Sequence, residues 1–288
     1  MLLAEPALQG PAYAHQRVNG SARIAFVASD GCSRLADLYQ RAPCRVLFPN
    51  VEPTDPPQAV LLTTSGGLTG GDRLRVDIRA RTGSHATLTT QAAEKIYRAL
   101  PDEGNANIDV HIDAASGACI EWLAQETIVF DGARLRRGFS ADMAADARLL
   151  AVESLVLGRA AMNETLRRGY VHDSWRIRRD DRLVFADALH LDGDIAGQRT
   201  MPFGFADATA CGTLVYAAPE APSLLDYARA CSREHALVAH VTTREHLLIV
   251  RFLARHAVDL RAAIISLTGA IREAALGRSR RLPQVWYC

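Results

Sequence analysis

The chain of 288 residues lacks several features that mark common classes of protein. No apolar run approaches the roughly 18 residues that a membrane-spanning helix needs. The first residues, MLLAEPALQG, have no basic start of the kind that opens a secretory signal. The net charge is only +1, so electrostatics favour neither a nucleic-acid nor a membrane partner. We therefore expect a soluble cytoplasmic protein, with the short basic groups at 134–137 and 278–281 on solvated faces or partner contacts.

The motifs of common catalytic and metal sites are also missing. The 6 cysteines are scattered without a C-x-x-C pair, which disfavours a disulfide framework or a structural zinc site. Neither G-x-S-x-G nor H-E-x-x-H occurs, so no standard hydrolase nucleophile or zinc protease is indicated. Lys95 is the single lysine among 33 basic residues. Coding bias explains such a skew, although it also makes this ammonium a candidate for a specific role.

The most distinctive stretch is the glycine-rich run at residues 65–72, SGGLTGGD. Paired glycines are typical where the backbone needs a positive φ or where another chain segment comes very close. A phosphate-binding loop would have Lys and then Ser or Thr after the second glycine pair, whereas this chain has Asp72 and Arg73. A carboxylate would repel phosphates, and the G-x-G-x-x-G fingerprint is absent. The run therefore predicts a shaped turn and no nucleotide site.

Short alternating segments dominate residues 20–217 and predict a β-rich body. Sandwich, barrel and β-solenoid arrangements all fit this pattern, and no sequence repeat of fixed period is visible. Residues 218–288 instead predict two helices, at 223–233 and 259–276, and two strands, at 237–242 and 247–253. We expect a single domain over 1–288, mainly β and solenoid-like or irregular, with a smaller C-terminal α/β portion. Strands are expected near 21–28, 58–64, 73–79, 85–91, 108–113, 118–130, 148–157, 170–178, 182–191 and 210–217.

Acidic residues interrupt two apolar strands and follow the glycine run. Glu153 lies within the apolar segment 149–157, Asp187 lies within 183–189, and Asp72 ends the run. An isolated ionised group costs several kcal/mol to bury, so each carboxylate must be paired, hydrated or bound to a cation. An internal polar site or water channel is one interpretation. Pairing with a buried arginine is the other, for which three arginines are available: Arg159, Arg167 and Arg168.

Taken together, the motifs resemble those of the UreD family of urease accessory proteins, called UreH in some organisms. The resemblance runs along nearly the whole chain, and its blocks occur in order. They are 65–72 (SGGLTGGD), 94–98 (EKIYR), 120–126 (IEWLAQE), 130–133 (FDGA), 157–159 (LGR), 164–165 (ET), 189–191 (LHL), 251–253 (RFL) and 282–286 (LPQVW).

This resemblance implies a non-enzymatic factor that matures the nickel enzyme urease. Proteins of the family bind the urease apoprotein and recruit UreF and, through it, the GTPase UreG, whose GTP hydrolysis is coupled to nickel insertion. The implied fold is β-rich with few helices. No tightly bound cofactor is implied, and Ni²⁺ would be carried only in transit.

The resemblance also implies an internal tunnel for nickel, lined by Asp72, Glu153 and Asp187. Carboxylate oxygens suit transit because they hold Ni²⁺ weakly enough to release it, whereas a Cys or His cage would trap it. Three further residues are expected as neighbours of this path, namely Glu164, His172 and His190. A structural role is expected for the motif residues Gly66, Gly67, Gly70, Gly71, Lys95, Tyr97 and Arg98.

Two other functions compete with this one. A β-solenoid enzyme acting on polysaccharides would place two carboxylates in a groove. The aromatic content of 6%, with 3 Trp, is modest for sugar stacking, and regular solenoid rungs are not visible. A purely structural interaction module would keep every partner and involve no metal.

Overall fold

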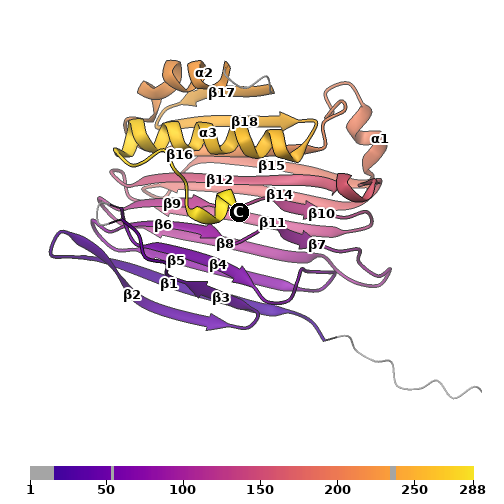
Figure 1. Cartoon of the computed structure of the whole chain (residues 1–288), viewed down its shortest axis with the longest axis horizontal. Helices are drawn as coiled ribbons and strands as arrows, with labels where there is room; N and C mark the ends of the chain where they lie inside the picture. The colour runs from indigo at the N-terminus through magenta and orange to yellow at the C-terminus, as the bar shows by residue number, and fades with distance from the viewer. Residues whose placement is uncertain (1–15, 53–54, 234–237) are drawn as a thin grey trace, which may run out of the picture.

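The computed structural model describes residues 16–52, 55–233 and 238–288, which form two large β-sheets and a small set of helices (Figure 1). The first sheet runs in the order β15 (Arg182–Asp194), β14 (Arg168–Arg179), β11 (Arg134–Met143), β8 (Ala106–Ala114), β5 (Arg73–Ala80), β1 (Asn19–Ser29) and β2 (Cys32–Arg41). The second sheet runs β17 (Val238–Arg244), β18 (Leu247–Ala254), β16 (Ala210–Ala217), β12 (Arg148–Arg159), β9 (Cys119–Leu123), β6 (His85–Thr90), β4 (Gln58–Thr63) and β3 (Cys44–Leu47). Three short strands attach beside it, β7 (Glu94–Ile96), β10 (Thr127–Val129) and β13 (Glu164–Thr165).

From β5 to β14 the chain passes alternately between the two sheets, as in a β-solenoid, and the short strands β7, β10 and β13 lie on the side of the second sheet. The strands β1, β5, β8, β11 and β14 are parallel neighbours in one sheet, and β4, β6, β9 and β12 are parallel neighbours in the other. Short turns join each pair, and each is closed by the same backbone hydrogen bond: Ser84 to Arg81, Ala118 to Ala115, and Ala147 to Ala144. The mainly β, solenoid-like prediction is confirmed, and the absence of regular rungs inferred from the sequence is wrong.

The alternation of apolar and polar residues determines which face of each strand in the first sheet points toward the interior. In β5 the side chains of Leu74, Val76 and Ile78 are buried between the sheets, while Arg73 and Arg75 face outward. In the second sheet, β12 is buried along both faces because helices cover its outer side. Five strands escaped the sequence analysis, namely the short β7 and β13 and the longer β2, β3 and β11. Strand β11 contains the basic group 134–137, which was expected on a solvated face or a partner contact; Arg137 of this group is instead only 3% exposed and lies between the sheets.

The C-terminal portion continues the second sheet and then covers it. Strand β18 pairs with β16, and helix α3 (Ala257–Leu276) lies along the outer face of this sheet, as Figure 1 shows. Gly277 ends α3 with φ of 62°, as the sequence predicted. The other helices are α1 (Ile195–Thr200), α2 (Leu225–Arg233) and three single turns, η1 (Ala160–Met162), η2 (Ala221–Leu224) and η3 (Gln284–Tyr287). Within the described ranges, no helix is long and apolar enough to cross a membrane.

Candidate functional site between the two sheets

The glycine-rich turn packs against the second motif, residues 94–98. The Leu68 N–H donates to the carbonyl of Lys95 over 2.7 Å, and the Tyr97 hydroxyl donates to the carbonyl of Gly66 over 2.9 Å. Gly67 has φ of 141°, and a Cβ there would lie 2.4 Å from the Tyr97 ring and 2.8 Å from the Lys95 oxygen. The glycine is therefore required by close approach as well as by backbone conformation.

The Asp72 carboxylate stabilises this turn by accepting backbone hydrogen bonds. Its two carboxylate oxygens accept the backbone N–H groups of Val18 and Thr69, each over 2.8 Å. The side chain is 3% exposed and lines neither of the two cavities described below. The structure thus shows Asp72 shaping the turn, and its contact with nickel stays a prediction.

Further motif residues gather at the same end of the molecule. The rings of Tyr97 and Phe130 meet edge to face, with centroids 4.9 Å apart. Glu164 accepts the Asp131 N–H over 3.1 Å and forms an ion pair with Arg159. Segments that are distant in sequence thereby form one continuous surface. Glu164 belongs to this surface and lines neither cavity.

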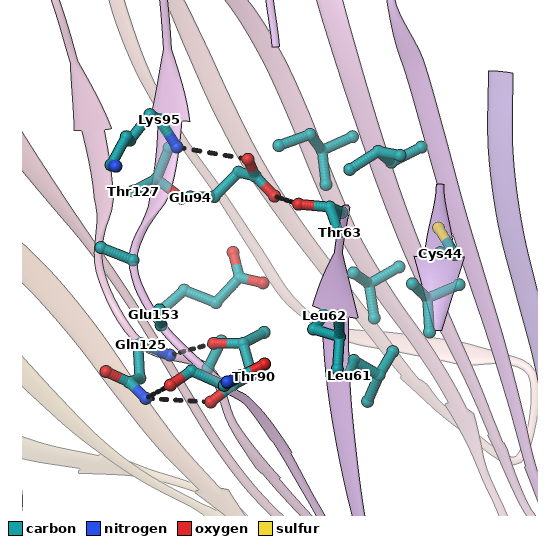
Figure 2. A pocket seen from close by; sticks show the side chains of 18 of the residues that line it. Cys44, Leu61, Leu62, Thr63, Thr90, Glu94, Lys95, Gln125, Thr127 and Glu153 are labelled. Carbon is teal, nitrogen blue, oxygen red and sulfur yellow. Dashed lines mark hydrogen bonds between the residues drawn. The ribbon is translucent and has the colours of Figure 1, made fainter. Parts of the chain in front are cut away.

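A cavity of about 250 Å³ lies beneath this end, between the two sheets. Figure 2 shows the Glu153 carboxylate pointing into this space from β12. Most of the wall is apolar, so the polar groups that reach it are the informative ones. The lining includes Cys44, Leu61, Thr63, Leu74, Val76, Thr90, Glu94, Ile108, Val110, Trp122, Ala124, Gln125, Thr127, Arg137 and Glu153.

Glu94 supplies a second carboxylate to this cavity, beside the glycine-rich turn. Its oxygens accept the Thr63 hydroxyl over 3.0 Å and the Lys95 N–H over 3.2 Å. Burial raises the pKa of Glu94 above its ordinary value, and these two hydrogen bonds oppose the rise. Glu94 was not among the residues predicted to contact nickel. Lys95, also at this wall, is exposed.

Glu153 lies deepest, where the first cavity ends. The Trp122 indole donates to one of its oxygens over 3.1 Å, and Arg137 Nε lies 3.0 Å from the other. Arg137 in turn forms two parallel hydrogen bonds, of 2.8 Å each, with Asp173 on β14. Burial raises the pKa of Glu153, the Arg137 charge opposes the rise, and the Asp173 charge adds to it.

Glu153 also lines a second cavity, of about 160 Å³. Asp173 and Asp187 line this cavity as well, and Asp187 pairs with Arg251 over 2.5 Å. The Asp187 and Arg251 side chains are 32% and 41% exposed, so this cavity reaches the surface beside them. Glu153 and Asp187, predicted to share one path, are therefore brought to the same cavity.

The buried-arginine alternative holds for Glu153 alone, whose partner is Arg137. Asp187 pairs with the partly exposed Arg251, and Asp72 accepts backbone N–H groups instead of pairing with an arginine. The three arginines expected as partners lie elsewhere, because Arg159 pairs with Glu164, Arg167 with Asp131, and Arg168 donates its backbone N–H to Asp131.

His172 and His190 face away from the cavities. They are directly opposite each other on β14 and β15, with ring centroids 5.6 Å apart. Asp173 and Asp187 point inward, and side chains alternate along a strand, so both histidines occupy the outer face of the sheet. The structure separates them from the proposed path by the thickness of the sheet.

The alternation of inward and outward side chains along each strand would have identified Asp173 and Arg137, which the sequence analysis missed. Asp173 shares the inward face of β14 with Val171 and Trp175, and Arg137 shares that of β11 with Leu135 and Phe139.

Among the residues that the structure describes, no three His, Cys, Asp or Glu side chains are grouped to hold a metal ion. Burial raises the pKa of the Cys211 thiol, in the second cavity, to about 12, so it stays protonated. The site therefore offers dispersed oxygen ligands rather than a metal cage.

These features define a class of mainly β, solenoid-like protein with an acidic cavity system between its sheets. The family model of the UreD urease accessory protein matches residues 18–287. The chain belongs to the UreD family of urease accessory proteins. It is similar to the urease accessory proteins UreD of Magnetococcus marinus (41% identity, 94% of each chain) and Rhodopseudomonas palustris (38% identity, 99% of each chain). A third relative, UreD of Azorhizobium caulinodans, is 37% identical over 94% of this chain and 97% of its own.

Proposed function

We propose that this chain acts in the cytoplasm as a non-enzymatic scaffold that matures urease. In this proposal it binds the urease apoprotein and UreF, and UreF brings the GTPase UreG, whose GTP hydrolysis drives nickel insertion. Family membership supports the urease accessory role. The turn that most resembles a phosphate loop supports a chain that hydrolyses nothing itself, because Asp72 and Arg73 replace the residues that such a loop requires.

We further propose that Ni²⁺ crosses the chain as cargo through the two cavities. The observation that carries this proposal is the position of Glu153, which lines both of them. Glu94 stands toward one end of the path, and Asp173 and Asp187 stand toward the other. Conduction requires ligands strong enough to admit the ion and weak enough to release it, which separated carboxylates satisfy.

The path is tested by blocking it without touching a carboxylate. Val110→Phe adds a ring to the first cavity from β8, and Asp187→Ala removes the ligand at the far opening. We expect both variants to lower urease activation by about tenfold, the effect of losing about 1.4 kcal/mol at one step, while complex assembly with UreF and urease is unchanged. Asp192→Ala, an exposed carboxylate on the same strand as Asp187, should activate normally.

Two results separate this proposal from its competitors. If Val110→Phe folds, assembles and activates urease normally, the interaction module without metal transit replaces the conduit. Loss of UreF binding in Asp187→Ala would show that this residue supports assembly instead. A polysaccharide-active enzyme is disfavoured because the chain belongs to a family of urease accessory proteins.

A further inference from the structure

A hollow of about 570 Å³ opens on the outer face of the first sheet, on the opposite side of that sheet from the interior cavities. Its lining includes Ser21 on β1, which lies directly opposite Arg41 on β2 and Arg75 on β5. Arg75 faces outward on β5, so all three side chains are on the outer face. The serine side chain is much shorter than the two arginines beside it, which leaves the surface hollowed between them.

The charges around this hollow do not balance. Five arginines and two aspartates line it. Arg75 donates two hydrogen bonds of 2.9 Å to Asp77, and an Arg136 nitrogen lies 3.8 Å from Asp109. Positive charge in excess on one surface attracts carboxylates and phosphates. The lining arginines that form no ion pair within the described part of the chain are Arg23, Arg41 and Arg73.

Two of these three arginines are held in place by uncharged neighbours. The Arg23 guanidinium lies over the ring of Tyr39 on β2, 4.7 Å from its centroid, so it leans toward the edge of the sheet. Arg41 donates a hydrogen bond to the side chain of Asn19. Side chains that are already ordered lose less conformational freedom when they bind a ligand. Both guanidinium groups are therefore positioned in advance for an anion.

The hollow borders the free edge of β2, at the end of the molecule opposite helices α2 and α3 (Figure 1). Among the described residues, no backbone N–H or carbonyl of 32–41 bonds to a residue outside β1 and β2. Unpaired groups at a sheet edge are a template for a further strand. Two large apolar side chains of β2, Leu35 and Tyr39, are 40% and 41% exposed. The edge thus offers main-chain hydrogen bonds and apolar contacts beside the positive charges.

We propose that an extended acidic segment of a partner protein adds to the edge of β2 and places its carboxylates in this hollow. Tyr39 and Arg41 are two residues apart on β2, and Arg23 leans over Tyr39. Every second side chain of an added strand faces the same way, so acidic residues at alternate positions meet both arginines. This inference goes beyond the proposed function and does not depend on nickel transit.

The surroundings of the hollow favour a peptide over a nucleic acid. Asp77 and Asp109 are part of its lining, where they repel the closely spaced phosphates of a nucleic acid. A strand edge supplies N–H and carbonyl groups in the pattern that another main chain completes, and a phosphodiester backbone cannot complete it. The net charge of +1 also gives the whole chain little attraction for a polyanion.

The charge requirement is tested with a fluorescent peptide of about eight residues that alternates Glu and Thr, added to the full-length chain and followed by anisotropy. We expect Arg23→Gln/Arg41→Gln to bind it about tenfold more weakly than the wild type, the combined effect of two exposed ion pairs. High salt should reduce this difference. The matched control is Arg34→Gln/Arg79→Gln, which removes two exposed charges of the same sheet outside the hollow and should bind normally.

Strand addition is tested separately from charge. A peptide with Pro in place of Thr keeps every carboxylate but loses half of its N–H groups, so it should bind more weakly than the first peptide. The first peptide should also slow hydrogen exchange of the backbone amides of β2. Exchange in β15, the edge strand at the other end of the same sheet, should stay unchanged.

Equal peptide binding by the wild type and Arg23→Gln/Arg41→Gln would overturn the proposal, and so would equal losses in the two double variants. Equal binding of the Pro peptide without protection of β2 would rule out strand addition. Tighter binding of an oligothymidylate of similar length would assign the hollow to phosphates instead. A dimer of the chain that Arg23→Gln/Arg41→Gln dissociates would assign the edge to a second copy. None of these results depends on urease activation, which tests the nickel path through Val110→Phe.

Discussion

Two buried glutamates on the second sheet, Glu121 on β9 and Glu153 on β12, have opposite surroundings. Glu121 is 0% exposed beneath α3 and pairs with two arginines, Arg272 of the helix and Arg278 just beyond it. The Thr87 hydroxyl donates to the same carboxylate over 2.5 Å. Both of its oxygens are therefore engaged, and positive charge is in excess.

Glu153 faces the other side of the same sheet, toward the cavities. It shares Arg137 with Asp173, so negative charge is in excess, and one of its oxygens lacks a hydrogen bond. The pKa values of the two groups follow these surroundings. Burial would raise the pKa of both, but the Arg272 and Arg278 charges reverse the effect at Glu121, whereas burial prevails at Glu153.

The comparison shows that a buried carboxylate in an apolar strand is not by itself a sign of function. A fully satisfied one fastens the C-terminal helix to the sheet. An incompletely satisfied one beside a cavity leaves room for a ligand. The number of arginine partners and the free volume distinguish the two cases.

The largest expected effect comes from breaking the Glu121 cluster. Glu121→Gln leaves two arginines without a counter-charge beneath α3, so we expect the free energy of unfolding to fall by about 3–5 kcal/mol. Denaturant unfolding of the purified variant measures this loss. Nickel binding should be unaffected in whatever fraction remains folded.

Glu153→Gln is the matched control for that prediction. Arg137 keeps its bidentate partner Asp173, so stability should change by only about 1 kcal/mol. Nickel binding and urease activation should fall instead. Equal losses of stability in the two variants would contradict the distinction between them.

A smaller effect is expected from pH. The pKa of Glu121 is lowered, so its contribution to stability is complete above the unfolded value of about 4.3 and is lost as pH falls through the folded value. The groups that face it are the guanidinium groups of Arg272 and Arg278, the Thr87 hydroxyl and the Cys119 thiol, whose pKa burial raises to about 11.

We therefore expect the stability gap between wild type and Glu121→Gln to shrink below about pH 4. Unfolding of both proteins at about pH 7 and about pH 4 or lower measures the change. A gap that stays constant down to acid pH would show that the carboxylate contributes through packing rather than charge.

The smallest effect is expected at the outer face of the first sheet. His172→Ala and His190→Ala should change stability by about 0.5 kcal/mol or less, as surface substitutions do. Urease activation should remain normal, because both rings are separated from the cavities by the sheet. Reduced activation with intact folding would restore these histidines to the nickel path and extend it to this face.

Much of the fold was predictable because burial leaves a periodic pattern. Alternation identified most of the long strands, and amphipathic spacing identified α3 together with its end at Gly277. The solenoid rungs were not visible, since their period is carried by backbone turns of different sequence and by return connections of unequal length. Strand β11 was missed because the basic group 134–137 hides an alternation in which Arg137 takes an inward position.

The site was predictable only in part, for a related reason. Glu153 and Asp187 stood out as charges in apolar strands, and they do line a shared cavity. Asp72 stood out for its place after the glycine run, yet its oxygens are used by the turn. Asp173 and Glu94 were not singled out, because neither interrupts an apolar run of the sequence and only the fold places them at the cavities.

The amino-acid sequence determined the family, the strand-rich character of the chain and the identity of two interior carboxylates, because motif order and alternation are local properties. Tertiary structure alone decided which guanidinium neutralises which acid, where volume is left unfilled, and which oxygen remains without a partner. Those outcomes depend on contacts between strands that are remote in sequence, such as β11, β12 and β14 around Arg137, and only folding brings these strands together.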